Sequence, residues 1–171
     1  ATALHVEAAL IDAFPSLTNL VKGHGAELGA AMLDELLDRY AAPIAHIPMP
    51  AILIKIEQEW RPDLTAEQLY ERTRRYWFCT PMGRSPSPTH AISVARGLIR
   101  EVYMIQGWEE YRGWPADRDA SRLQPYGDWK PNQIRRGFFG QVADEYGHLR
   151  RSSVRHLART GGQNPIAYAN C

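Results

Sequence analysis

The sequence HAISVARGLIREVYMIQGWEEY, residues 90–111, carries the clearest β-hairpin pattern in the chain. It reads as two strands joined by a tight turn at Arg96 and Gly97, because glycine tolerates the positive φ that such turns require. Side chains alternate along a strand, so Ile92 and Val94 should point to one face of the first strand. We therefore expect the domain to be built on a hairpin.

The second strand of this hairpin should lie inside a sheet or barrel, because both of its faces are mostly apolar. One face is expected to carry Ile99, Glu101, Tyr103 and Ile105, and the other Leu98, Arg100, Val102 and Met104. Arg100 and Glu101 are the exceptions to the apolar pattern, and an unpaired buried charge is costly. Each should therefore find a partner or reach solvent, or else face a ligand pocket.

Other stretches carry local signals of their own. The alternation of Ile52, Ile54 and Ile56 predicts a strand over residues 51–57. Thr65, with Gln68 three residues later, has the pattern of a capping box, so a helix should follow and run to about Arg75. The remaining expected elements are helices over 1–14 and 26–41, a short strand over 138–142, a basic helix over 147–158 and a C-terminal tail that packs back on the domain.

The prolines between Ala42 and Pro50 predict a stiff, extended linker, where we place a domain boundary. The expected organisation is a helical segment over 1–42, a linker over 43–50 and an α+β domain over 51–171. The expected fold class is α+β: an N-terminal helical pair followed by a small mixed β-barrel or sheet with flanking helices. Both N-terminal helices carry apolar stripes that need cover. They should pack on each other, on the barrel or on a neighbouring chain, and the last case implies a homodimer through these helices.

Composition excludes several classes of protein. Hydrophobic residues make up 44% of the 171 residues and charged residues 23%, as in ordinary globular proteins. No apolar run approaches the ~20 residues of a membrane-spanning helix. The two cysteines, Cys79 and Cys171, form neither a disulfide framework nor a zinc motif, so we expect a reducing, cytoplasmic location. The sequence contains no catalytic Ser/His/Asp pattern, P-loop or Rossmann fingerprint.

Charge is spread unevenly along the chain. Residues 1–60 have a net charge of −5 and residues 61–171 a net charge of +6, and 17 of the 20 cations are arginines. Arginine grips phosphates in a fork, so this asymmetry indicates nucleic acid, although a high-GC genome would also enrich arginine.

The candidate phosphate-binding residues are Arg96, Arg100, Arg135, Arg136, Arg150, Arg151 and Arg155. Trp77 and Trp108 are the candidate platforms on which bases would stack. The alternatives are that the arginines cover a solvated surface and that the tryptophans pack in the core.

The stretch VEAALIDAFPSLTNLVKGHG, residues 6–25, resembles the end of the GIY-YIG nuclease domain, in the branch similar to the ankyrin- and LEM-domain nucleases. The carrying residues are Glu7, then Leu10-Ile11 and Thr18-Asn19. The resemblance implies that Glu7 is a catalytic, metal-binding glutamate and that the cofactor is a divalent metal such as Mg²⁺. In that family the tyrosine-bearing strands and the arginine helix precede the glutamate. Because no such elements precede Glu7 here, the resemblance implies the C-terminal part of a longer bacterial nuclease protein.

Residues 51–171 resemble a domain found on the C-terminal side of such bacterial nucleases. The carrying pieces are ILIKI, LYERTRRYW, GLIREVYMIQGW, GFFG and QNPIAYANC. The order strand, helix, strand, strand also resembles the PUA-like barrels, including the EVE and ASCH groups, which bind RNA or modified bases. This second resemblance implies a PUA-like fold, although fold alone bears weakly on function.

Three functions remain open at this point. The first is a nucleic-acid-binding module, part of a DNA- or RNA-processing protein. The second is a metal-dependent endonuclease, which would need a further catalytic half, because the one carboxylate of Glu7 does not hold a metal and position a nucleophile unaided. The third is a domain that binds a small molecule, a modified nucleotide or another protein, with no role in nucleic-acid binding.

Overall fold

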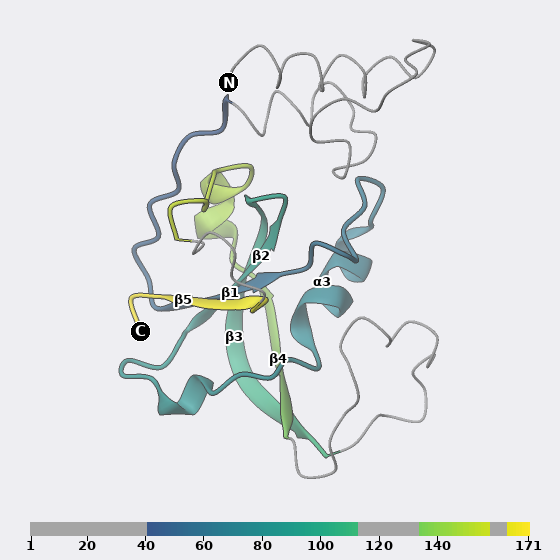
Figure 1. Cartoon of the computed structure of the whole chain (residues 1–171), viewed down its shortest axis with the longest axis vertical. Helices are drawn as coiled ribbons and strands as arrows, with labels where there is room; N and C mark the ends of the chain where they lie inside the picture. The colour runs from purple at the N-terminus through teal and green to yellow at the C-terminus, as the bar shows by residue number, and fades with distance from the viewer. Residues whose placement is uncertain (1–40, 113–133, 158–163) are drawn as a thin grey trace. The chain divides into compact units, whose positions relative to one another are not determined.

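The computed structural model describes residues 41–112, 134–157 and 164–171 (Figure 1). The chain divides into two compact units, Ala1–Pro43 and Ile44–Cys171. The expected helix over 1–14, which contains Glu7, and all but the last residue of the helix expected over 26–41 lie outside the described residues. In the part of the chain that is described, no helix is long and apolar enough to cross a membrane.

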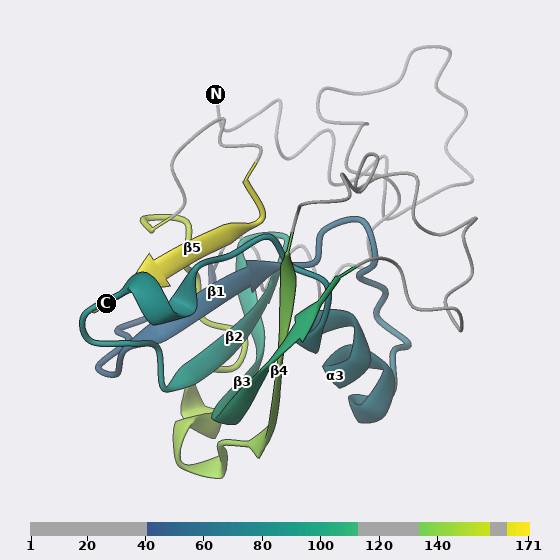
Figure 2. The ribbon, with the colours of Figure 1, turned by 90° about the horizontal axis from the view of Figure 1, so that it is seen from below.

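The second unit is a five-stranded mixed sheet, which confirms the α+β class. Its strands are β1 (Ala51–Lys55), β2 (His90–Ala95), β3 (Leu98–Tyr111), β4 (Arg135–Val142) and β5 (Ile166–Ala169). The order is β4-β3-β2-β1-β5, as Figure 2 shows, and β1 and β2 run parallel while the other neighbours are antiparallel. Since β4 and β5 form its two edges, the described sheet is open.

Among the described residues, three short helical elements connect the strands: α3 (Ala66–Arg74), η2 (Pro81–Gly83) and η5 (Asp144–Leu149). The crossover from β1 to the parallel β2 passes through α3, as parallel neighbours require. The predicted capping box is confirmed, because the Gln68 amide donates to Thr65 Oγ1 while the Thr65 amide donates to Gln68 Oε1.

The predicted hairpin is confirmed, with β2 and β3 paired from His90↔Met104 to Ala95↔Leu98. Its turn has φ of +54° at Arg96 and +75° at Gly97, as in a type I′ turn. The interior position of β3 is also confirmed, since it lies between β2 and β4.

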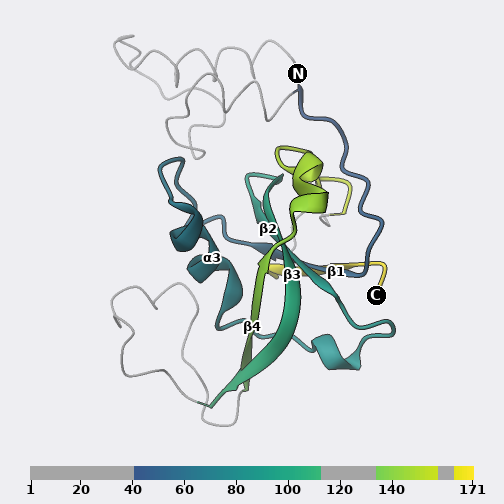
Figure 3. The ribbon, with the colours of Figure 1, turned by 180° about the vertical axis from the view of Figure 1, so that it is seen from behind.

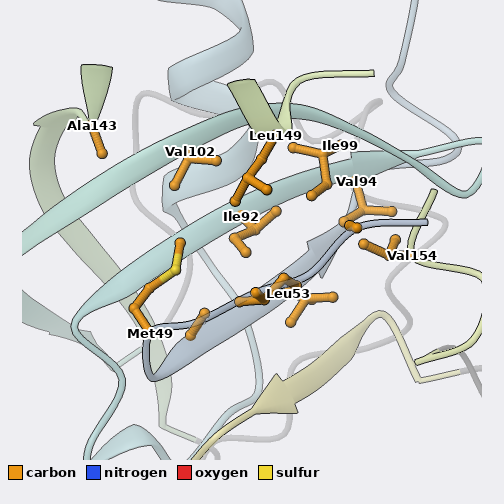
Figure 4. Close-up of a cluster of buried hydrophobic side chains, with 12 residues drawn as sticks. Met49, Leu53, Ile92, Val94, Ile99, Val102, Ala143, Leu149 and Val154 are labelled. Atoms are coloured by element: carbon orange, nitrogen blue, oxygen red, sulfur yellow. The ribbon is translucent and has the colours of Figure 1, made fainter. Parts of the chain in front are cut away.

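The predicted faces of β3 are wrong for Ile99. A β-bulge shifts the register: Ser93 faces Glu101 and Val94 faces Ile99, so Arg100 is an extra residue. An extra residue resets the alternation of side chains. Ile99 therefore packs in the same cluster as Val102 (Figure 4), whereas Tyr103 and Ile105 belong to the cluster on the other side of the sheet.

The two sides of the sheet are covered by different elements. Leu69 of α3 packs with Ile52, Ile54 and Ile56 on one side, and Leu149 of η5 packs in the other cluster. Figures 1 and 3 accordingly show α3 and η5 on opposite sides of the hairpin. Both faces of β1 are thus buried, which is typical of a strand with a parallel neighbour.

The segment expected to be a linker, residues 43–50, contributes to the core from Ile44 onward. Ala45, Ile47 and Met49 are buried, and the Ala45 amide donates to the Ser153 carbonyl at 2.8 Å. Alternate residues of this segment thus pack in the core cluster of the sheet. The expected return of the C-terminal tail is confirmed, because β5 pairs with β1 and Asn170 Nδ2 donates to the Ile47 carbonyl.

Gly140 tests how tightly the edge strand β4 packs against β3. A Cβ there would lie against the carbonyl oxygen of Met104, whereas a Cβ on Gly83 would meet only Thr80 Cβ, at 4.0 Å. We expect Gly140→Ala to lower the free energy of unfolding by about 1–3 kcal/mol, the usual cost of overpacking. Urea denaturation measures this, with Gly83→Ala as the matched control; equal midpoints for the two variants would contradict the packing.

His90, at the start of β2, should make stability depend on pH. Burial lowers its pKa from the ordinary 6.5, although the charge of Glu145 opposes the shift. Thr89 Oγ1 lies 2.9 Å from Nδ1, the Tyr146 ring packs on the imidazole, and Nε2 is buried with no partner among the described residues. The folded chain therefore binds the proton less readily than the unfolded chain, and stability should fall as the pH drops below about 6.5.

Urea midpoints measured between pH 7.5 and 5 check this expectation. The His90→Leu variant should lose this part of the pH dependence, whereas changing the exposed His148 to Leu should retain it. An unchanged profile in His90→Leu would show that another group is responsible.

Candidate nucleic-acid interface

Five of the seven candidate arginines lie on backbone segments that meet at the tip of the β2–β3 hairpin. This hairpin-tip cluster consists of Arg96, Arg100, Arg150, Arg151 and Arg155. Arg96 is in the turn, and Arg100 Nε donates to the Ala95 carbonyl at 3.2 Å. The Arg151 amide donates to the Ile99 carbonyl at 2.8 Å. The Arg155 side chain packs closely over Gly97, since its Cγ is 2.9 Å from the position that a Cβ on Gly97 would take.

The helix predicted over residues 147–158 is wrong in the described part, 147–157. A 3-10 helix ends at Leu149, and the backbone that follows combines short local hydrogen bonds with hydrogen bonds to the hairpin. The Val154 amide donates to the Gly97 carbonyl, and Ser153 forms a bridge with Leu98. These long-range hydrogen bonds replace the helical ones, and they are what bring residues 150–155 to the hairpin tip.

Three arginines of the cluster stand at unusual backbone positions. Arg96 and Arg151 have φ of +54° and +68°, a left-handed conformation that costs an L-residue roughly 1–2 kcal/mol. Arg100 is the extra residue of the bulge. Turns of this kind normally take Asn or Gly, and bulges are known to re-aim a side chain. Each departure from regular structure thus places an arginine at the same end of the sheet.

Carboxylates hold part of the cluster in place. Both oxygens of Glu57 accept from the Arg96 amide, at 2.8 and 2.7 Å, which leaves the Arg96 side chain out of this contact. Arg150 Nε donates to Glu101 Oε1 at 2.7 Å, and this hydrogen bond raises the pKa of the Arg150 guanidinium. The predicted partners of Arg100 and Glu101 are therefore present, but they are the Ala95 carbonyl and Arg150. Arg150, Arg151 and Arg155 remain exposed.

An aromatic side chain that sequence reasoning did not select lies at the same end of the sheet. The Arg100 guanidinium carbon is 4.1 Å from the centroid of the Trp60 ring. Trp60 and Arg100 are both partly exposed. One feature of the sequence could have pointed to Trp60: it precedes Arg61-Pro62, a turn signal, and a tryptophan next to a turn is expected at the margin of the core and not within a strand.

Arg135 and Arg136 lie elsewhere, because Tyr111, at the far end of β3 from the tip, pairs with Arg135. Arg135 is buried, and its Nη1 donates to the Tyr76 carbonyl at 3.0 Å. Arg136 pairs with Glu110 at 2.8 Å and donates to the Cys79 carbonyl. These contacts join β4 to the loop after α3, so both arginines have a structural role.

The two candidate stacking platforms also pack against the core. Trp77 is 4% exposed, and its Nε1 donates to the Thr73 carbonyl at 2.7 Å. Trp108 is partly buried, with its ring centroid 6.3 Å from that of Phe138. The alternative of core packing therefore describes Trp77, and Trp108 packs against the same cluster.

No metal centre is found among the described residues, where no three His, Cys, Asp or Glu side chains come together. Glu7, the predicted catalytic metal ligand, lies outside them. Comparison with protein-family models, with curated proteins and with solved structures gives no match.

The left-handed arginine of the turn should reduce stability. We expect Arg96→Asn to raise the free energy of unfolding by about 0.5–1 kcal/mol, because asparagine adopts positive φ more readily and suits this turn. The matched control is Arg84→Asn, where φ is −100° and no such gain is expected. Chemical denaturation measures both variants; a loss of stability in Arg96→Asn would show that the side chain contributes more than the turn costs.

Proposed function

We propose that the chain is a nucleic-acid-binding module whose phosphate-binding surface is the hairpin-tip cluster. The observation that carries the proposal is that Arg96, Arg100 and Arg151 each stand at a departure from regular backbone structure. Residues whose backbone conformation is unfavourable for their residue type are concentrated at functional sites.

The chemistry of the cluster suits a polyanion. Guanidinium groups present several donors in a planar fork, and phosphate oxygens accept them in pairs. Glu57, Glu101 and Asp144 neutralise part of the charge, while the side chains of Arg150, Arg151 and Arg155 remain exposed. The cluster presents exposed arginine side chains around a tight turn. This arrangement favours contacts to phosphates, and phosphate contacts position a nucleic acid without reading its sequence.

Two finer expectations complete the proposal. The first is a PUA-like fold, supported by the order β1, α3, β2 and β3, with the PUA-like domain belonging to a DNA- or RNA-processing protein. The second is the endonuclease alternative with Mg²⁺, which depends on Glu7 and on a further catalytic half. A small-molecule or protein-interaction domain is the alternative if nucleic acid does not bind.

A binding titration tests the proposal, using labelled single- and double-stranded DNA and RNA at several salt concentrations. We expect Arg151→Gln/Arg155→Gln to weaken binding at least tenfold at low salt and to reduce the slope of log K against log [salt] by about 1.5–2, the loss of two phosphate contacts. The control is Arg84→Gln/Arg112→Gln, which removes two exposed arginines outside the cluster.

The wild-type chain and the control should bind alike. Absence of binding to all four nucleic acids at low salt would refute the proposed function. Equal weakening by both double variants would show that net charge, and not the hairpin tip, is responsible.

A further inference from the structure

We infer that Trp60 and Arg100 form a stacking platform for one base of a single-stranded nucleic acid. The inference rests on the proposed function and adds to it the class of nucleic acid that the hairpin tip takes. It starts from the contact between the two side chains, which lie on different segments: Trp60 follows β1, and Arg100 is in the β3 bulge.

Contacts at the guanidinium and at Nε order the Arg100 side chain. Its guanidinium carbon is 4.1 Å from the Trp60 ring centroid, and its Nε donates to the Ala95 carbonyl at 3.2 Å. The first contact sets the guanidinium over the ring, and the second limits its rotation. A side chain ordered in this way has already lost the rotamer freedom that binding would otherwise remove.

A guanidinium is planar, and that of Arg100 lies over the Trp60 ring. A nucleobase stacks on a guanidinium plane as readily as on an aromatic ring. Both Arg100 and Trp60 remain partly exposed, so the stack reaches the surface. A base added to it would extend a row of three flat groups: indole, guanidinium and base.

The neighbouring arginines supply the second half of a single-strand site. Arg96 is separated from Arg100 by only three residues across the turn, and the Arg151 amide is bonded to Ile99, the residue before Arg100. Cations that track phosphates beside a flat side chain that stacks a base are the usual composition of a single-strand site.

A duplex fits this arrangement less well. Its bases are already stacked on one another, so it offers a π-face only at its ends or after a base has been unstacked, which costs a few kcal/mol. Phosphate contacts alone would be shared by duplex and single strand. A preference for single strands that depends on bases is therefore the property that separates this inference from the proposed function.

The experiment compares strands of equal length and charge that differ only in their bases. One labelled DNA strand carries thymine throughout, and the other carries abasic sites throughout; a uridine RNA strand and a DNA duplex complete the set. We expect the wild-type chain to bind the thymine strand roughly 5- to 100-fold more tightly than the abasic strand. The RNA strand shows whether ribose is tolerated.

Variants locate the effect. Arg100→Lys keeps the charge but loses the plane, so it should lose most of the preference for bases while binding the abasic strand as before. Trp60→Leu should do the same, and Arg84→Lys, an arginine stacked on Tyr168 instead, should leave the preference intact. Melting curves of each variant confirm that it is folded.

Two outcomes overturn the inference. Equal, salt-dependent affinity of the wild-type chain for the thymine and abasic strands refutes stacking and leaves the proposed phosphate-binding function standing. A preference for bases that survives in folded Arg100→Lys and Trp60→Leu places the stacking elsewhere. Lack of binding to every strand refutes the proposed function and this inference together.

Discussion

The pairing of β2 with β3 is the interaction on which the rest of this domain depends. β2 carries β1 and then β5 on one side, and β3 carries β4 on the other, so the hairpin joins the two halves of the sheet. Its tip also supplies the carbonyls of Gly97 and Ile99 that accept hydrogen bonds from residues 151–154. A shift of one residue in this pairing would move apolar side chains to the wrong face and release those acceptors.

The two ends of the hairpin use arginine in different ways. At the far end, Arg74 and Arg75 both bond to Glu71; burial raises the pKa of Glu71, but these hydrogen bonds outweigh it and lower the pKa. Such satisfied, partly exposed ion pairs contribute little to stability, about 0–1 kcal/mol each. At the tip, in contrast, Arg96 and Arg151 accept a left-handed backbone. Arginine is tolerated there at a cost in stability, which is why the tip and not the ion-pair network is the candidate site.

Composition selected arginine as the candidate residue type, and the fold divides the candidates into two groups. The excess of arginine after residue 60 identified seven candidates, and five of them meet at the tip because the chain returns there at residues 150–155. Arg135 is buried and donates to the Tyr76 carbonyl, and the Trp77 indole is buried and donates to the Thr73 carbonyl of α3. Trp60 was missed because its significance depends on Arg100, a contact between segments 40 residues apart in sequence.

The sequence by itself determined the local elements of this protein: the hairpin with its turn at Arg96 and Gly97, the capped helix after Thr65 and the buried strand β1. These depend on backbone preferences and on hydrogen bonds between near neighbours, which short stretches encode. Only the tertiary structure decided the bulge at Arg100 and the loss of the helix expected at 147–158. At both places, hydrogen bonds to distant residues compete with the regular local ones. The spacing of apolar residues in a short segment does not reveal which of the two sets of hydrogen bonds is the more stable.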